Sequence, residues 1–186
     1  MPQPSSPDRY SGTARALHWI TALAVFVMIP VGLTMSYRGN VMNLWDGLTN
    51  GLYSAHKLFG FLLLWLTAGR LAYRLLHGAP PDEPSLAWWQ KAGSHLVHWL
   101  LYGLLLVVPL LGWTGVSLFP ALRIFDLFDL PALAQPNEAA ARRVLGIHGA
   151  LALTLGALAI LHIAAALYHR FIRRDGVLSR MWPPAG

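Results

Sequence analysis

The chain has 186 residues, of which 55% are hydrophobic and only 12% are charged, and its formal net charge is +6. Soluble domains average about 25% charged residues, so much of this chain must contact lipid rather than water. A helix that crosses a bilayer needs about 20 apolar residues. We therefore expect one integral membrane domain over residues 1–186, an all-α bundle of four transmembrane helices with no separate soluble domain.

The absence of cysteine narrows the chemistry further. It excludes iron–sulfur clusters with cysteine ligands, c-type haem attachment and any thiol mechanism. The basic residues flank apolar segments, which is typical of membrane anchoring and does not indicate nucleic acid. The chain therefore falls in the class of membrane proteins whose sites must use histidine or other non-thiol groups.

Four apolar segments predict the spans, and the polar start of the chain lacks a signal-peptide pattern, so we expect the first segment to remain as a membrane helix. Pro30 should kink this helix. The second segment holds Lys57 and Arg70, whose long side chains can reach the two membrane surfaces. The connection over residues 119–143 could carry a short interfacial helix. The expected spans are residues 16–37, 52–76, 94–118 and 144–171.

Lys and Arg are unevenly divided between the two ends of these spans. Nine lie at the end that holds both chain termini, and five lie at the other end. Because basic residues concentrate on the cytoplasmic side, both termini are expected in the cytoplasm. We call these two ends inner and outer.

Four histidines lie within or at the ends of the apolar segments, where an ionisable side chain is costly and is a functional candidate by default. His148 and His162 are 14 residues apart on one helix, about 21 Å along its axis and close to the same face. His56 is expected at the depth of His148, and His18 at the depth of His162. Two level-matched pairs can ligate two stacked b haems from both faces, although each single histidine could instead be hydrogen-bonded within the core. Structural zinc fits less well, because it needs four grouped ligands.

Other polar residues could complete the two sites. His95 and His98 begin the third span, and they could replace His18 as a ligand, line a pocket or lie at the interface. His169 continues the stripe of His162, and His95, His98 and His169 are candidates for a quinone pocket. Arg70 lies at the inner level, where it could pair with haem propionates as a bidentate cation. No catalytic residue can be named from the sequence.

These residues occur in an order that resembles the bacterial cytochrome b561 family over nearly the whole chain. The resemblance implies four transmembrane helices with two haem b groups, ligated by His18 and His162 on the inner side and by His56 and His148 on the outer side. The matching segments are Arg15-Ala-Leu-His-Trp19, Ser54-Ala-His-Lys57, Gly69-Arg-Leu71, Gly93-Ser-His-Leu-Val-His98, Pro109-Leu-Leu-Gly112, Leu161-His-Ile-Ala-Ala-Ala-Leu-Tyr-His169 and Arg174-Asp-Gly-Val-Leu-Ser-Arg-Met-Trp-Pro183.

The resemblance also implies an oxidoreductase of the bacterial inner membrane that oxidises periplasmic superoxide to oxygen and reduces ubiquinone. The outer basic residues would attract such an anionic donor; they are Lys57, Arg123, Arg142 and Arg143. Two other classes remain open. The chain could be a cytochrome b membrane anchor that takes electrons from a periplasmic hydrogenase or dehydrogenase, or it could be a membrane protein without a redox role.

Overall fold

A computed structural model describes residues 9–182 and places four long helices in them. All four are long and apolar enough to cross a membrane, as the sequence predicts. They are α1 (Gly12–Ser36), α2 (Gly47–His77), α3 (Trp88–Leu118) and α4 (Glu138–Tyr168). Short π-helical segments extend α1 over Tyr37–Val41 and α4 over His169–Arg173, and a short 3-10 helix follows at Leu178–Arg180. The second segment, interrupted by Lys57 and Arg70 in the sequence, forms one unbroken helix of 31 residues.

Local signals account for where the helices begin. Ser11, Asp46 and Asn137 each accept a hydrogen bond from a backbone N–H three residues later, so they cap α1, α2 and α4. Such caps satisfy backbone donors that have no partner inside the helix. Gly78 ends α2 with a positive φ of 72°, a conformation that glycine adopts without steric cost. The helix α1 continues through Pro30.

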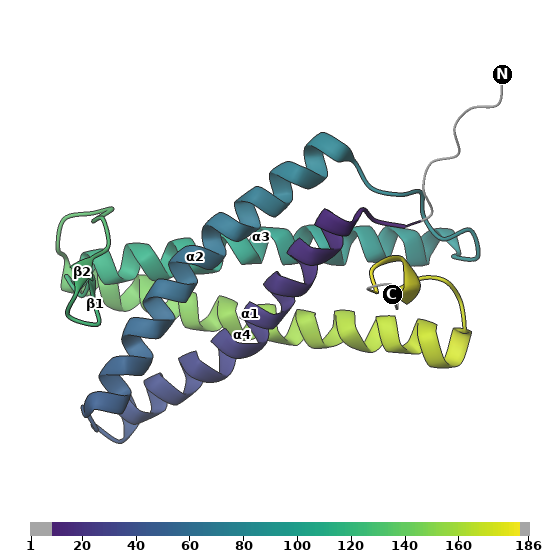
Figure 1. Cartoon of the computed structure of the whole chain (residues 1–186). Helices are drawn as coiled ribbons and strands as arrows, with labels where there is room; N and C mark the ends of the chain where they lie inside the picture. The colour runs from purple at the N-terminus through teal and green to yellow at the C-terminus, as the bar shows by residue number, and fades with distance from the viewer. Residues whose placement is uncertain (1–8, 183–186) are drawn as a thin grey trace.

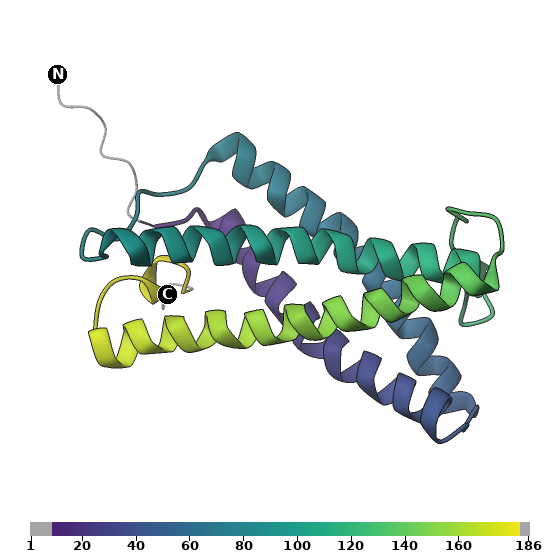
Figure 2. The same cartoon turned by 180° about the vertical axis from the view of Figure 1, so that it is seen from behind.

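The helices form two hairpins that cross each other (Figure 1). The helices α3 and α4 lie side by side, and the α1–α2 hairpin crosses this pair at an angle, as the view from behind also shows (Figure 2). Both described ends of the chain and the α2–α3 loop lie at the inner end of the bundle. The α1–α2 turn and the α3–α4 connection lie at the outer end (Figure 1).

The α3–α4 connection contains a short β-hairpin, so the interfacial helix expected there from the sequence is wrong. Strand β1 (Arg123–Ile124) pairs antiparallel with β2 (Phe128–Asp129). The turn between them places Phe125 and Asp126 at positive φ, which prevents helical continuation. The side chain of Ile124 is fully buried, so the hairpin is packed onto the outer end of the bundle.

Most large apolar side chains of the helices are exposed on the bundle surface. Water would penalise such a surface, whereas lipid matches it. Helix contacts inside the bundle depend on small residues. A Cβ at Gly115 of α3 would lie 2.4 Å from Leu145 Cδ2 of α4, so only glycine permits this approach. The interior is therefore a set of close helix contacts between two hairpins, within which the histidines lie.

Candidate functional site: two histidine pairs

The structure brings the four span histidines together as two pairs, one at each end of the bundle. The ring centres of His56 on α2 and His148 on α4 are 6.1 Å apart, and the ring planes are nearly perpendicular at 89°. The ring centres of His18 on α1 and His162 on α4 are 6.3 Å apart, with an interplanar angle of 72°. The helix α4 therefore contributes one histidine to each pair.

The spacing within each pair fits a metal ion held between two imidazoles. An imidazole–metal bond is about 2 Å, and the ligating nitrogen lies about 1 Å from the ring centre, so two axial ligands place their ring centres about 6 Å apart. In the part of the chain that the structure describes, no group of three or more His, Cys, Asp or Glu side chains could hold a metal ion. Two ligands per level suit an iron whose other positions are filled by a porphyrin, as in a b-type haem.

The outer pair is held by contacts that leave one nitrogen of His148 available. The Nδ1–H of His148 donates to the Val108 carbonyl oxygen of α3 at 2.8 Å, and the lone pair therefore lies on Nε2. Such an outer-shell hydrogen bond orients an imidazole ligand and fixes its tautomer. The Nδ1 atom of His56 is buried without a hydrogen-bond partner in the described chain. An unpaired buried nitrogen is rare in a folded protein and is one sign of a missing partner at this pair.

Two glycines make room for the outer histidines. A Cβ at Gly32 of α1 would lie 3.0 Å from Cε1 of His56, and a Cβ at Gly112 of α3 would lie 3.0 Å from Cε1 of His148. Each ring thus lies against the backbone of a neighbouring helix, which any other residue would push away. Gly32 could not be identified from the sequence, since nothing in a single sequence indicates which helix this glycine faces.

The inner pair has more polar neighbours. Arg70 donates a hydrogen bond from NH2 to Nδ1 of His18 at 2.8 Å, and its guanidinium lies 5.1 Å from the ring centre of Tyr102. The ring of His98 lies 5.2 Å from that of His162, closer than the ring of His18. The structure therefore keeps His98 beside the inner pair, as a neighbour that could be either a ligand or part of the pocket.

The other two quinone-pocket candidates are each paired with a carboxylate. His95 is exposed, and its Nε2 pairs with Asp82 of the α2–α3 loop at 3.1 Å. His169 is largely buried, and its Nδ1 lies 2.6 Å from Oδ2 of Asp175. Arg173 is also near Asp175, with an Nε–Oδ2 distance of 3.8 Å. The Asp175 partner could not be deduced, because it lies beyond the π-helical end of α4, where the chain reverses.

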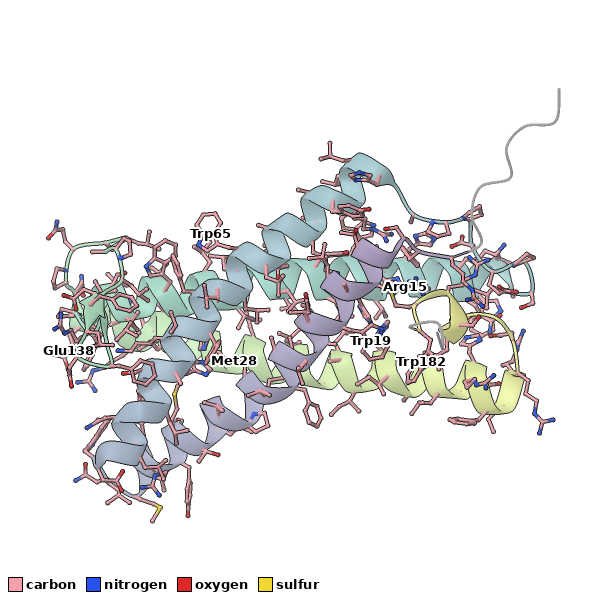
Figure 3. The ribbon with its side chains drawn as sticks, in the orientation of Figure 1. Arg15, Trp19, Met28, Trp65, Glu138 and Trp182 are labelled. Atoms are coloured by element: carbon pink, nitrogen blue, oxygen red, sulfur yellow. The ribbon has the colours of Figure 1, made fainter. Side chains whose placement is uncertain are left out.

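A segment after α4 contacts the start of α1 beside His18. The ring of Trp19 lies 5.3 Å from that of His18 and 5.4 Å from that of Trp182. Its Nε1 donates to the Met181 carbonyl at 2.9 Å. Arg15 donates to the Trp182 carbonyl nearby, and the three side chains gather at this end of the bundle (Figure 3). The segment therefore covers the start of α1 beside the inner pair.

At the outer end, most of the basic residues expected to attract an anion are engaged within the chain, and Arg143 is exposed. The Lys57 ammonium donates to the carbonyl oxygens of Ala121 and Arg123. The remaining ion pairs there are Arg123 with Asp129 at 3.6 Å, Arg142 with Glu138 at 2.5 Å and Arg38 with Asp46 at 2.6 Å. Five basic residues against four acidic ones leave this end with a surplus of one positive charge.

Comparison with known proteins gives a consistent result over almost the full length. A family model described as prokaryotic cytochrome b561 matches residues 9–184. The chain is 29% identical to cytochrome b561 homolog 2 of Escherichia coli K12, covering 95% of this chain and 93% of that protein. It is 29% identical to cytochrome b561 homolog 1 of the same strain, covering 95% and 98%. It is 24% identical to a protein of Yersinia pestis named probable superoxide oxidase CybB, covering 94% and 96%.

Proposed function

Because the chain belongs to the prokaryotic cytochrome b561 family, we propose that it is a di-haem b cytochrome that oxidises superoxide at its outer end and reduces ubiquinone at its inner end. The chain is a multi-pass bacterial membrane protein of electron transfer. The proposal of two haems rests on the two histidine pairs, whose ring centres are 6.1 and 6.3 Å apart and which lie at opposite ends of one bundle.

Bound haem b would supply one-electron transfer at each level, and ligation by two histidines would leave no open position for oxygen. The overall reaction balances with two superoxide anions per quinone. Each superoxide loses one electron to become oxygen, and ubiquinone takes two electrons and two protons to become ubiquinol. The residues of this chain must then orient the ligands, bind the acceptor and deliver two protons.

The contact between Arg70 and His18 competes with ligation of haem by His18, and this gives Arg70 a role at the inner level. Arginine is a donor only, so Nδ1 of His18 accepts in this contact and a neutral ring carries its hydrogen on Nε2. Metal ligation through Nε2 needs the opposite tautomer. The contact and the ligation are therefore alternatives, and Arg70 must pair with another acceptor when haem is bound. A propionate carboxylate is well suited to this guanidinium.

The His169–Asp175 pair is our candidate for proton delivery to the acceptor. The carboxylate accepts the Nδ1–H of His169 at 2.6 Å, so this bond orients the ring and leaves Nε2 for a second partner. Both side chains are mostly buried at the inner end, where protons would come from the cytoplasm. His95 is the weaker candidate, because its exposed ring is engaged by Asp82.

Superoxide as the donor is supported by the name of the Yersinia pestis relative. Long-range attraction contributes little to this proposal, since the outer end has only one surplus positive charge and most of its basic side chains are paired. With so small a net charge there is little field for salt to screen, so the reaction rate should depend only weakly on ionic strength.

A stopped-flow experiment with purified protein tests both ends separately. After rapid mixing with superoxide, the absorption bands should show that the haems become reduced. Mixing with ubiquinol should also reduce the haems, starting from the inner end. His148→Ala should remove the outer haem and abolish rapid reduction by superoxide while ubiquinol still reduces the inner haem. His162→Ala should give the reverse. Pyridine haemochrome analysis should give two haems for the unchanged chain.

The opposite results distinguish the alternatives. No reduction by superoxide, together with rapid reduction by a periplasmic hydrogenase or dehydrogenase, would favour the membrane-anchor function. A chain without haem absorbance would reject a redox role altogether. Orientation has a separate test: reporters fused after residue 186 and within the α1–α2 turn should report the cytoplasm and the periplasm, respectively. A periplasmic C-terminus would exchange the inner and outer assignments.

A further inference from the structure

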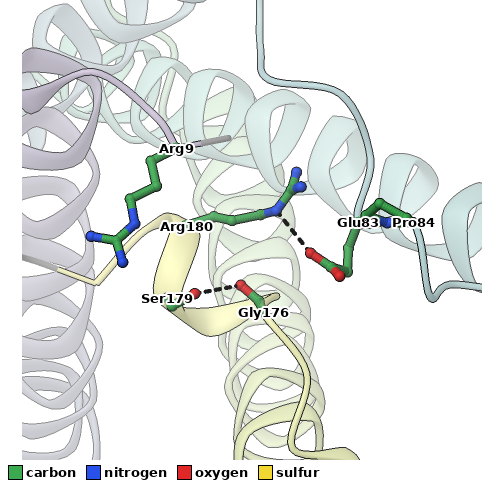
Figure 4. A pocket seen from close by; sticks show the side chains of 6 residues that line it. All are labelled: Arg9, Glu83, Pro84, Gly176, Ser179 and Arg180. Atoms are coloured by element: carbon green, nitrogen blue, oxygen red, sulfur yellow. Dashed lines mark hydrogen bonds and ion pairs between the residues drawn. The ribbon is translucent and has the colours of Figure 1, made fainter. Parts of the chain in front are cut away.

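A pocket at the inner end lies outside both histidine pairs. It has a volume of about 290 Å³ and is formed where three distant segments meet (Figure 4). Arg9 comes from the residues before α1, Glu83 and Pro84 from the α2–α3 loop, and the third segment is the C-terminal turn. That turn contributes Gly176, Ser179 and Arg180. The pocket therefore depends on the folded arrangement of the whole inner end.

The charges around the pocket leave one guanidinium uncompensated. The Nε of Arg180 lies 3.2 Å from Oε2 of Glu83, so the acidic charge is paired, and the NH1 of Arg180 donates to the Pro81 carbonyl. In Figure 4, Arg180 lies between Glu83 and Arg9. Arg9 is exposed, and no ion pair joins it to any residue between 9 and 182. The pocket thus holds two guanidinium groups and one carboxylate.

The pocket lies at the inner end of the spans, where lipid headgroups are expected. The indoles of Trp19 and Trp182 lie at this end, and tryptophan concentrates at membrane–water interfaces. Nine basic residues against four acidic ones leave the inner end with a surplus of five positive charges, compared with one at the outer end. A basic pocket at this depth is suited to the phosphate of an anionic lipid.

We propose that this pocket binds a phosphate group, carried by an anionic phospholipid of the inner leaflet, through the guanidinium groups of Arg9 and Arg180 and the hydroxyl of Ser179. Free phosphate has the same chemistry and is the competing source. The Ser179 hydroxyl now donates to the Gly176 carbonyl at 2.8 Å, and it can turn to donate to phosphate instead. A bound headgroup would join the three segments that close the inner end, whatever the electron donor and acceptor are.

Native mass spectrometry of the full-length protein, stripped of lipid in mild detergent, tests the proposal directly. The probes are phosphatidylglycerol, phosphatidylcholine and inorganic phosphate. We expect phosphatidylglycerol to bind more tightly than phosphatidylcholine. Arg9→Gln should weaken its binding about fivefold, the effect of one basic residue at an anionic surface. Arg9→Lys should retain most of the affinity. The matched control is Arg143→Gln, which removes one exposed charge at the outer end.

Each outcome bears on the proposal. Equal binding of phosphatidylglycerol and phosphatidylcholine would overturn it, and so would equal losses in Arg9→Gln and Arg143→Gln, which would indicate general attraction to the protein. Displacement of phosphatidylglycerol by inorganic phosphate would support the phosphate site and assign it to the free ion. Because lipid binding is measured without electron transfer, failure of the redox proposal would leave this result unchanged.

Discussion

Adding one methyl group at Gly112 should loosen the outer histidine pair. A Cβ at this position of α3 would lie 3.0 Å from Cε1 and 3.2 Å from Nδ1 of His148. The ring cannot retreat freely, because Nδ1 donates to the Val108 carbonyl at 2.8 Å. Gly103 on the same helix is the matched control, since a Cβ there would meet nothing within 4 Å.

The two substitutions should have opposite effects on the free energy of unfolding. Alanine is favoured over glycine inside a helix by about 1 kcal/mol, so Gly103→Ala should be neutral or stabilising. Overpacking of a closely packed site costs about 1–3 kcal/mol, which at Gly112 offsets that gain and leaves a net loss of up to about 2 kcal/mol. Displacing an oriented ligand commonly lowers metal affinity about 10- to 100-fold, and we expect the lower figure for the outer haem.

The assay is the transfer of haem from each purified variant to an excess of apomyoglobin, followed by absorbance. Gly112→Ala should release its outer haem about tenfold more readily than the unchanged protein, while the inner haem is retained. Gly103→Ala should match the unchanged protein. If the two alanine variants release haem alike, the close approach of Gly112 to His148 does not matter for the site.

Two further substitutions and one titration test other parts of the fold. Gly115→Ala would place a Cβ 2.7 Å from Cγ of Leu145, so α3 and α4 must separate, and the thermal midpoint followed by circular dichroism should fall. The backbone N–H of Thr49 and the Arg38 guanidinium lower the pKa of Asp46 from 3.8 to about 2. The contribution of Asp46 to stability is therefore complete above about pH 4 and lost as the pH falls through 2. A midpoint near 3.8 in an NMR titration of Asp46 would contradict this. Lys57→Met removes two hydrogen bonds to loop carbonyls, so amide exchange of residues 120–130 should accelerate; unchanged exchange would mean that packing alone holds the loop.

The levels of the histidines could be predicted from the sequence because the bilayer and the helix impose simple geometry. A helix rises 1.5 Å per residue, and the ends of each span are marked by charged residues, so His56 and His148 must lie at one depth. The same reasoning gives the depth of His18 and His162. The structure agrees on which rings face each other, while their role as ligands stays a prediction.

Rotation about the helix axes and the loop structure could not be predicted in this way. Tertiary packing decides which helix faces Gly32, and it also brings His98 closer to His162 than His18 is. A single sequence does not encode such packing locally. The interfacial helix expected in the α3–α4 connection was wrong for a related reason. The apolar residues of this connection allowed an interfacial helix, but the positive φ of Phe125 and Asp126 and the hydrogen bonds from Lys57 stabilise a hairpin.

The contribution of α4 to both histidine pairs has a consequence for variation in this family. Since His148 and His162 belong to one continuous helix, the separation of the two sites is a covalent property, about 21 Å, and does not depend on how the hairpins cross. Loops can lengthen or shorten without altering it. One residue inserted between the two histidines would rotate one site by about 100° relative to the other. The interval of α4 between them should therefore tolerate exchange of side chains but no change in length.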